Sequence, residues 1–177
     1  MLEYVSVYTN FIQAEIRNSG RMLIESIETT LEHSEIEGLG GTADYFALCG
    51  GEVCPLYLCD LQYGIGVEVE AEENQQLLTY AVIIDNIYPH LIDEVELVIV
   101  QPRVYGGDPI KRWKCSIDEV RKHRDKILGS IGKQHRKLGE HCRWCPAKRI
   151  CPDMNEQALA IAQTEFAVIP TAQDVDK

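Results

Sequence analysis

The segment GGTADYFALCGGEVCPLYLCDLQYG, from Gly40 to Gly64, contains two apolar runs with a short break between them. The adjacent Gly50 and Gly51 at this break are typical of a β-hairpin, so the two runs are expected to form neighbouring antiparallel strands. Each expected strand carries one aspartate, Asp44 on the first and Asp60 near the end of the second. The hairpin would therefore bring two carboxylates close to each other.

Outside this segment, apolar residues recur at helical or strand spacing. A helix and a strand are expected before the hairpin, and a helix, a buried strand, an edge strand and a basic helix capped by Ser116 after it. The expected ranges are 2–18, 21–30, 72–91, 95–103, 110–116 and 116–137, and a short helix is expected after Pro152. This order predicts a mixed sheet flanked by helices, in the α/β or α+β class.

The composition is that of a globular protein, with 45% hydrophobic and 25% charged residues in a chain of 177. We expect one domain over residues 1–165 that includes a cysteine loop at 139–152, followed by a tail at 166–177. No apolar run approaches the roughly 18 residues that cross a bilayer, and no signal peptide is visible, so a cytoplasmic location without a membrane partner is expected.

Basic residues are concentrated in one part of an acidic chain. The formal net charge is -11, yet 13 of the 17 lysines and arginines lie between Lys111 and Arg149. Such a block is a candidate surface for the phosphates of DNA, although a solvated helix face would have the same composition. The residues expected to contact nucleic acid are Lys111, Arg112, Lys114, Arg121, Lys122 and Arg124.

The most specific motif is the cysteine loop, in which Cys142, Cys145 and Cys151 have the spacing C-x2-C-x5-C. Glycine and proline residues flank these cysteines, so the backbone can turn and the thiolates can converge on one metal. Zinc and a 4Fe–4S cluster both need a fourth ligand, and free cysteines at chance spacing are the alternative. The candidates for the fourth ligand are Cys49, Cys54, Cys59, Cys115 and His141.

Two further pairs of residues suggest a second kind of site. Carboxylates such as Asp44 and Asp60 are hard oxygen ligands that suit Mg or Mn, although aspartates at strand ends are also common turn formers. Gln76 and Tyr80 are four residues apart and share one helix face, where an amide and a phenol would hold a nucleotide or a metal-bound water. Tyr80 also fits the apolar stripe of that helix.

These motifs occur in an order that resembles one known family. GGTAD, DLQYG, QLLTY and CRWCPAKRIC follow one another as in the RecB-type branch of the PD-(D/E)xK nucleases. The chain is most similar to phage-encoded exonucleases with an iron–sulfur cluster, which are relatives of the AddB nuclease domain and the CRISPR-adaptation exonucleases. The resemblance extends from Arg21 to Asp153 and implies a restriction-endonuclease-like core.

The resemblance also implies a role for each motif residue. Asp44 matches the first metal-binding aspartate and Asp60 the acid of the D-x-K element. Gln76 and Tyr80 match the Q-x3-Y helix motif, and the three loop cysteines match the C-terminal cluster ligands. The implied function is a Mg- or Mn-dependent DNA exonuclease of phage recombination or DNA processing, acting in the host cytoplasm.

The sequence departs from the family pattern at two places. Gln62 stands where the family has a lysine that orients the attacking water. Met1 begins what looks like a later helix of the family. The first cluster cysteine and a metal-binding histidine of the family pattern would then be missing, and His33 is in the wrong setting to replace that histidine.

The alternatives are an enzyme of weakened activity, an inactive module that binds nucleic acid or a partner protein, a partner chain that supplies the missing segment, and a fragment of a longer chain.

Overall fold

The computed structural model describes residues 2–65, 67–133 and 136–166. The chain divides into two compact units, Met1–Ile131 and Gly132–Lys177. The first unit contains the sheet and its helices, and the second contains the cysteine loop and the helix α4, Pro152–Phe166. Apart from Phe166, which ends α4, the expected tail at 166–177 lies outside the described residues.

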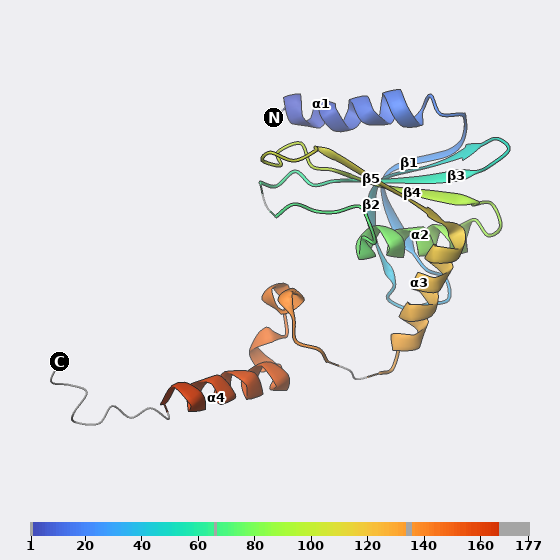
Figure 1. The fold of residues 1–177 in the computed structure, drawn as a ribbon. Helices are drawn as coiled ribbons and strands as arrows, with labels where there is room; N and C mark the ends of the chain where they lie inside the picture. The colour runs from blue at the N-terminus through green and yellow to red at the C-terminus, as the bar shows by residue number, and fades with distance from the viewer. Residues whose placement is uncertain (1, 66, 134–135, 167–177) are drawn as a thin grey trace. The chain divides into compact units, whose positions relative to one another are not determined.

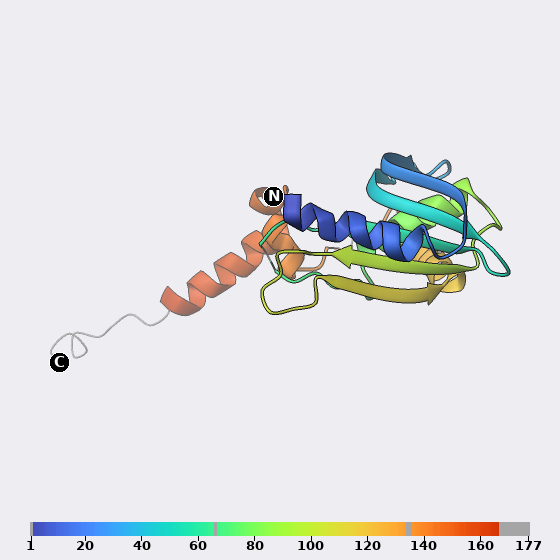
Figure 2. The same cartoon turned by 90° about the horizontal axis from the view of Figure 1, so that it is seen from above.

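The first unit is a mixed five-stranded sheet flanked by helices, an α+β fold, as expected from the sequence (Figures 1 and 2). The strands lie in the order β1-β2-β3-β4-β5, and only β3 and β4 are parallel. The bounds are Arg21–Glu32, Gly40–Gly50, Pro55–Leu61, Glu94–Val100 and Ile110–Ser116. The expected hairpin is confirmed as β2 and β3, and the expected edge strand as β5.

Helices cover both faces of this sheet (Figure 1). The helix α1, Leu2–Phe11, continues as a π-helical segment, Ile12–Ile16, and lies on one face. The helices α2, Gln75–Ile87, and α3, Ile117–Ser130, lie on the other, where α2 makes the crossover that parallel strands need. Successive residues of β3 point to opposite faces, so Leu58 packs in the core cluster that contains α2 and its neighbour Cys59 in the one that contains α1.

The helix ends differ from the expected ones. Ser116 caps α3 through a reciprocal capping box with Glu119, which confirms the expected start of this helix. The expected end near 137 is wrong, because α3 stops at Ser130, before an extended Ile131 and a Gly132 with φ of 75°. Beyond Pro152, α4 has 15 residues and is longer than the short helix expected there.

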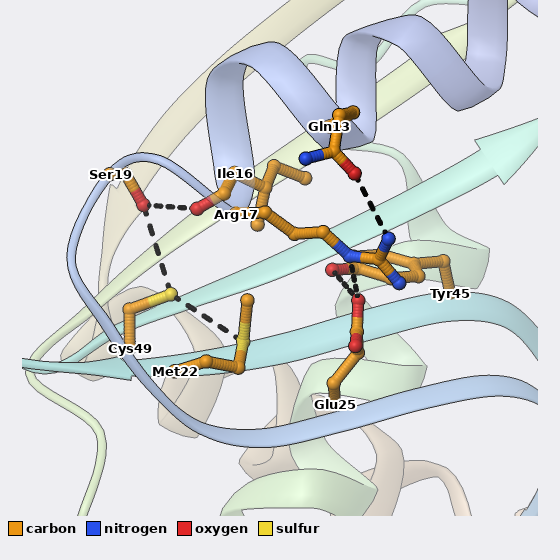
Figure 3. Close-up of polar contacts among 8 residues, drawn as sticks. All are labelled: Gln13, Ile16, Arg17, Ser19, Met22, Glu25, Tyr45 and Cys49. Carbon is orange, nitrogen blue, oxygen red and sulfur yellow. Dashed lines mark hydrogen bonds and ion pairs between the residues drawn. The ribbon is translucent and has the colours of Figure 1, made fainter.

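Polar contacts hold the π-helical segment against the sheet (Figure 3). Arg17 Nε donates to Glu25 Oε1 of β1 at 2.7 Å, and the Tyr45 hydroxyl of β2 donates to the same oxygen at 2.9 Å. The hydrogen bond from Arg17 lowers the pKa of Glu25. Ser19 Oγ donates to the Ile16 carbonyl at 2.7 Å and closes the turn into β1. These contacts fix the C-terminal end of the helical segment, and therefore the direction of α1.

A buried histidine between α2 and α3 predicts a pH dependence of stability. His123 Nε2 lies 3.1 Å from Thr79 Oγ1, and burial, helped by the charge of Lys126, lowers the imidazole pKa. The unfolded chain then binds the proton more readily, so the free energy of unfolding falls as the pH falls below the ordinary value of 6.5. Urea denaturation between pH 7.5 and about 5 should show this loss, and it should be smaller in His123→Gln.

The exposed His90 provides the matched control, because its backbone φ of 64° suits asparagine. His90→Asn should lose stability with falling pH as the wild-type protein does. If His123→Gln shows the full wild-type loss, another group is responsible for it.

Candidate active site

Asp44 and Asp60 face each other across the hairpin. The last paired residues of β2 and β3 at this end are Tyr45 and Cys59, so Asp44 and Asp60 are the next residue on each strand, just beyond the paired part. Asp44 Oδ2 accepts a hydrogen bond from the Leu61 backbone N–H at 2.7 Å, which holds its carboxylate over the end of β3. The structure therefore brings together the two acids that the sequence places on separate strands.

The carboxyl group of Asp60 lies in a buried environment with two amide groups beside it. Burial raises its pKa, and the neighbouring Asp44 raises it further, whereas a hydrogen bond from Gln62 opposes the shift. Gln62 Nε2 donates to Asp60 Oδ2, and Gln76 Nε2 lies 3.4 Å from Asp60 Oδ1. A desolvated carboxyl group with a second acid next to it favours a proton or a bound cation.

The helix α2 presents the other two expected site residues. Asn74 caps its N-terminus by accepting from the Leu77 N–H at 3.1 Å. The contact between Gln76 and Asp60 shows that the first turn of the helix lies beside the end of β3. Gln76 Nε2 lies 3.4 Å from the Tyr80 hydroxyl. Tyr80 is also a member of the core cluster, and a Cβ built on Gly41 would lie only 2.9 Å from its ring. Glycine at position 41 thus allows the tyrosine to reach the site.

One residue that the sequence did not single out also belongs to this region. Tyr8 on α1 is 9% exposed, and its hydroxyl has no hydrogen-bond partner among the described residues. Burial raises its pKa, and interactions with Cys59 and with the carboxyl groups of Asp44 and Asp60 add to the effect. In the sequence, Tyr8 fits the spacing of an apolar helix face. This spacing does not predict where the hydroxyl group of Tyr8 lies.

Acidic partners neutralise much of the expected DNA-binding surface. Lys111 Nζ lies 2.6 Å from Glu68 and 2.5 Å from Glu70. Arg121 makes a two-point contact with Asp85, at 3.2 Å for each nitrogen–oxygen pair. Three of the other expected residues also form ion pairs: Arg112 and Lys114 with Glu96, and Arg124 with Asp125. Lys122 is exposed on α3. The free positive charge is smaller than the sequence count suggests.

The cysteine loop of the second unit contains two short 3-10 turns, Glu140–Trp144 and Lys148–Ile150. Cys142 and Cys151 are half-buried, and Cys145 is exposed. Within the described ranges, no group of three or more His, Cys, Asp or Glu side chains is arranged to hold a metal ion. His141 lies in the same loop, whereas the other expected candidates for a fourth ligand are buried in the first unit: Cys49, Cys54, Cys59 and Cys115.

Within the part of the chain that the structure describes, no helix is both long and apolar enough to span a membrane.

Comparison with known proteins places the chain in a family. One solved structure that the chain matches is titled "Crystal structure of SSO0001". The match has a TM-score of 0.40 and 15% sequence identity, and it covers 86% of this chain and 68% of that chain. The model of the family described as "Protein of unknown function (DUF2800)" matches residues 1–176. Because this match spans nearly the whole sequence, the protein belongs to the DUF2800 family.

Proposed function

We propose that this protein is a metal-dependent DNA exonuclease of phage recombination or DNA processing, related to the RecB-type PD-(D/E)xK nucleases. The observation that carries the proposal is the opposed pair Asp44 and Asp60, with the amides of Gln62 and Gln76 beside Asp60. Two close carboxylates at a strand end suit a Mg²⁺ or Mn²⁺ ion. The raised pKa of Asp60 supports this fit, because a cation would offset the cost of its ionised form.

Each side chain has a role in this proposal. A bound Mg²⁺ or Mn²⁺ would polarise the scissile phosphate and lower the pKa of a water molecule. Asp44 and Asp60 would hold the ion, and the amide of Gln62 would orient the Asp60 carboxylate and donate to a phosphate oxygen or water. Gln76 and Tyr80 would support the substrate from α2.

The test is an assay on end-labelled single- and double-stranded DNA with Mg²⁺, Mn²⁺ or EDTA. The proposal expects degradation from an end in either metal and none in EDTA. A protein that leaves both substrates intact in both metals would contradict it.

A second candidate function is a catalytically inactive module that binds nucleic acid or a partner protein. The observation that favours it is Gln62, which is uncharged and already donates its amide to Asp60. On this proposal the partner would be DNA or a second protein chain. Its test is salt-sensitive DNA binding, or a stable complex, that persists when Asp44 and Asp60 are replaced by alanine. Loss of binding in that double variant would argue against it.

We also propose that Cys142, Cys145 and Cys151 hold a 4Fe–4S cluster or a zinc ion together with a fourth ligand. Elemental analysis of protein purified without oxygen should find iron or zinc bound, and Cys145→Ser should lose most of it, because a hydroxyl is a poor replacement for a thiolate ligand. Arg143→Ala in the same loop is the matched control and should keep the metal. Wild-type protein that retains neither metal would contradict the proposal.

A further inference from the structure

Three residues from separate segments form an aromatic cluster, which we call the Tyr–Arg platform: Tyr4 on α1, Tyr63 after β3 and Arg103 after β4. The two rings lie edge to face with their centroids 6.5 Å apart. The guanidinium carbon of Arg103 lies 5.8 Å from the centroid of the Tyr4 ring and 5.2 Å from that of Tyr63. The cation is therefore close to both rings.

The platform lies next to the acidic pair. Tyr63 directly follows Gln62, whose amide donates to Asp60. Tyr63 is three residues after Asp60, so the Cα atoms of these two residues are at most about 11 Å apart. On α1, Tyr4 lies one helical turn before Tyr8, whose hydroxyl experiences the charges of both aspartates. Tyr63 and Tyr4 are thus each only a few residues away from a residue at or near the acidic pair.

Hydrogen bonds from Gln101 connect the two loops that provide Tyr63 and Arg103. Gln101 is buried, accepts from the Val69 N–H at 3.1 Å and donates to the Val67 carbonyl at 3.2 Å. These bonds tie Val67 and Val69, in the loop after β3, to the residue that directly follows β4. Contacts of this kind lower the ordering cost of the side chains that the two loops present.

The platform is accessible, and its charge is not neutralised. Tyr4 is 40% exposed, and Arg103 has no ion-pair partner among the described residues, in contrast to the paired cations of β5 and α3. Two neighbouring residues of the loop after β3 are strongly exposed apolar side chains, with exposed fractions of 70% for Ile65 and 81% for Val67. An exposed set of aromatic and apolar side chains with an unpaired arginine suits a ligand that has flat rings and negative charge.

We propose that the Tyr–Arg platform stacks an unpaired nucleobase of the substrate and places the adjoining phosphate at Asp44 and Asp60. This inference rests on the proposed nuclease function and names its substrate class as single-stranded DNA. A duplex keeps its bases stacked on one another, so an aromatic platform reaches only bases that are already unpaired. Arg103 would contribute both a cation–π contact and a phosphate contact.

The experiment measures stacking separately from cleavage. A single-stranded oligonucleotide with one 2-aminopurine is titrated with protein in EDTA, and both the fluorescence change and the dissociation constant are recorded. Tyr63→Leu keeps an apolar side chain against Tyr4 but removes the ring. It should lose the fluorescence change and weaken single-strand binding roughly 5- to 150-fold, the range expected for one lost base–aromatic stack. Tyr63→Phe should behave like the wild type.

Tyr105→Ala is the matched control, since it removes an exposed tyrosine from the loop after β4 that takes no part in the platform. It should leave both signals unchanged. If Tyr63→Leu binds and alters the fluorescence as the wild type does, the platform only packs α1 against the loops, and the inference fails even when the wild type degrades DNA. If the wild type binds no oligonucleotide and cuts none, the proposed function fails as well. A platform that binds a protein segment would leave oligonucleotide binding unaffected by Tyr63→Leu, and this too would overturn the inference.

Discussion

Replacement of Asp60 with asparagine is expected to reduce metal-dependent DNA cleavage to about one hundredth of the wild-type rate or less. Loss of a residue that only supports a metal ligand commonly costs about 10- to 100-fold, so loss of a direct ligand should cost at least as much. Asparagine keeps the shape of the side chain and an oxygen for the Gln62 amide, but it removes the negative charge. The measurement is the single-turnover rate on end-labelled single-stranded DNA with saturating Mn²⁺.

Asp93 offers a control for this substitution. It lies beyond the opposite end of β3, where its carboxylate accepts from the Cys54 N–H at 2.8 Å. Asp93→Asn should therefore leave the cleavage rate close to that of the wild type, and thermal unfolding should show that both variants are folded. Cleavage by Asp60→Asn at the wild-type rate would show that the acidic pair is not needed for the reaction.

Replacement of Gln62 with lysine is expected to raise the rate of cleavage by roughly 10²–10³-fold, because a positive charge near the scissile phosphate stabilises the charge that develops in the transition state. A lysine would also lower the pKa of Asp60, which burial and Asp44 raise, and so favour the ionised form that binds a metal. The same single-turnover assay measures the change.

Gln62→Met separates the charge from the length of the side chain, and it should not raise the rate. If Gln62→Lys is no faster than an active wild type, the glutamine already performs the task of the lysine. If neither protein cuts, the inactive-module proposal is favoured, because the family lysine alone does not restore the reaction.

The pairing of the two aspartates could be predicted from the sequence because its causes are local. The Gly50–Gly51 step sets the turn, and strict alternation along both strands fixes which residues share a face. Gln76 and Tyr80 could be placed for the same reason, since four residues make about one helical turn. In each case the sequence distance is short and one geometric rule decides the outcome.

Contacts between distant segments could not be predicted in this way. The basic block looks like an open cationic surface in the sequence, but Lys111 meets Glu70, which is 41 positions away, only after the sheet has formed. The convergence of Tyr4, Tyr63 and Arg103 likewise depends on how α1 crosses the sheet and on how two loops meet at Gln101. Spacing along the chain contains no information about either arrangement.

The division of the seven cysteines between the two units gives each unit its own chemical reporter. Four thiols are buried in the first unit, where burial raises the pKa of Cys115 to about 11, so an alkylating reagent reaches them only when that unit opens. The three thiols of the loop are exposed or half-buried, and a metal would shield them. The amplitude of the fast phase of labelling would thus fall when a metal occupies the loop, and the slow phase reports the opening of the sheet.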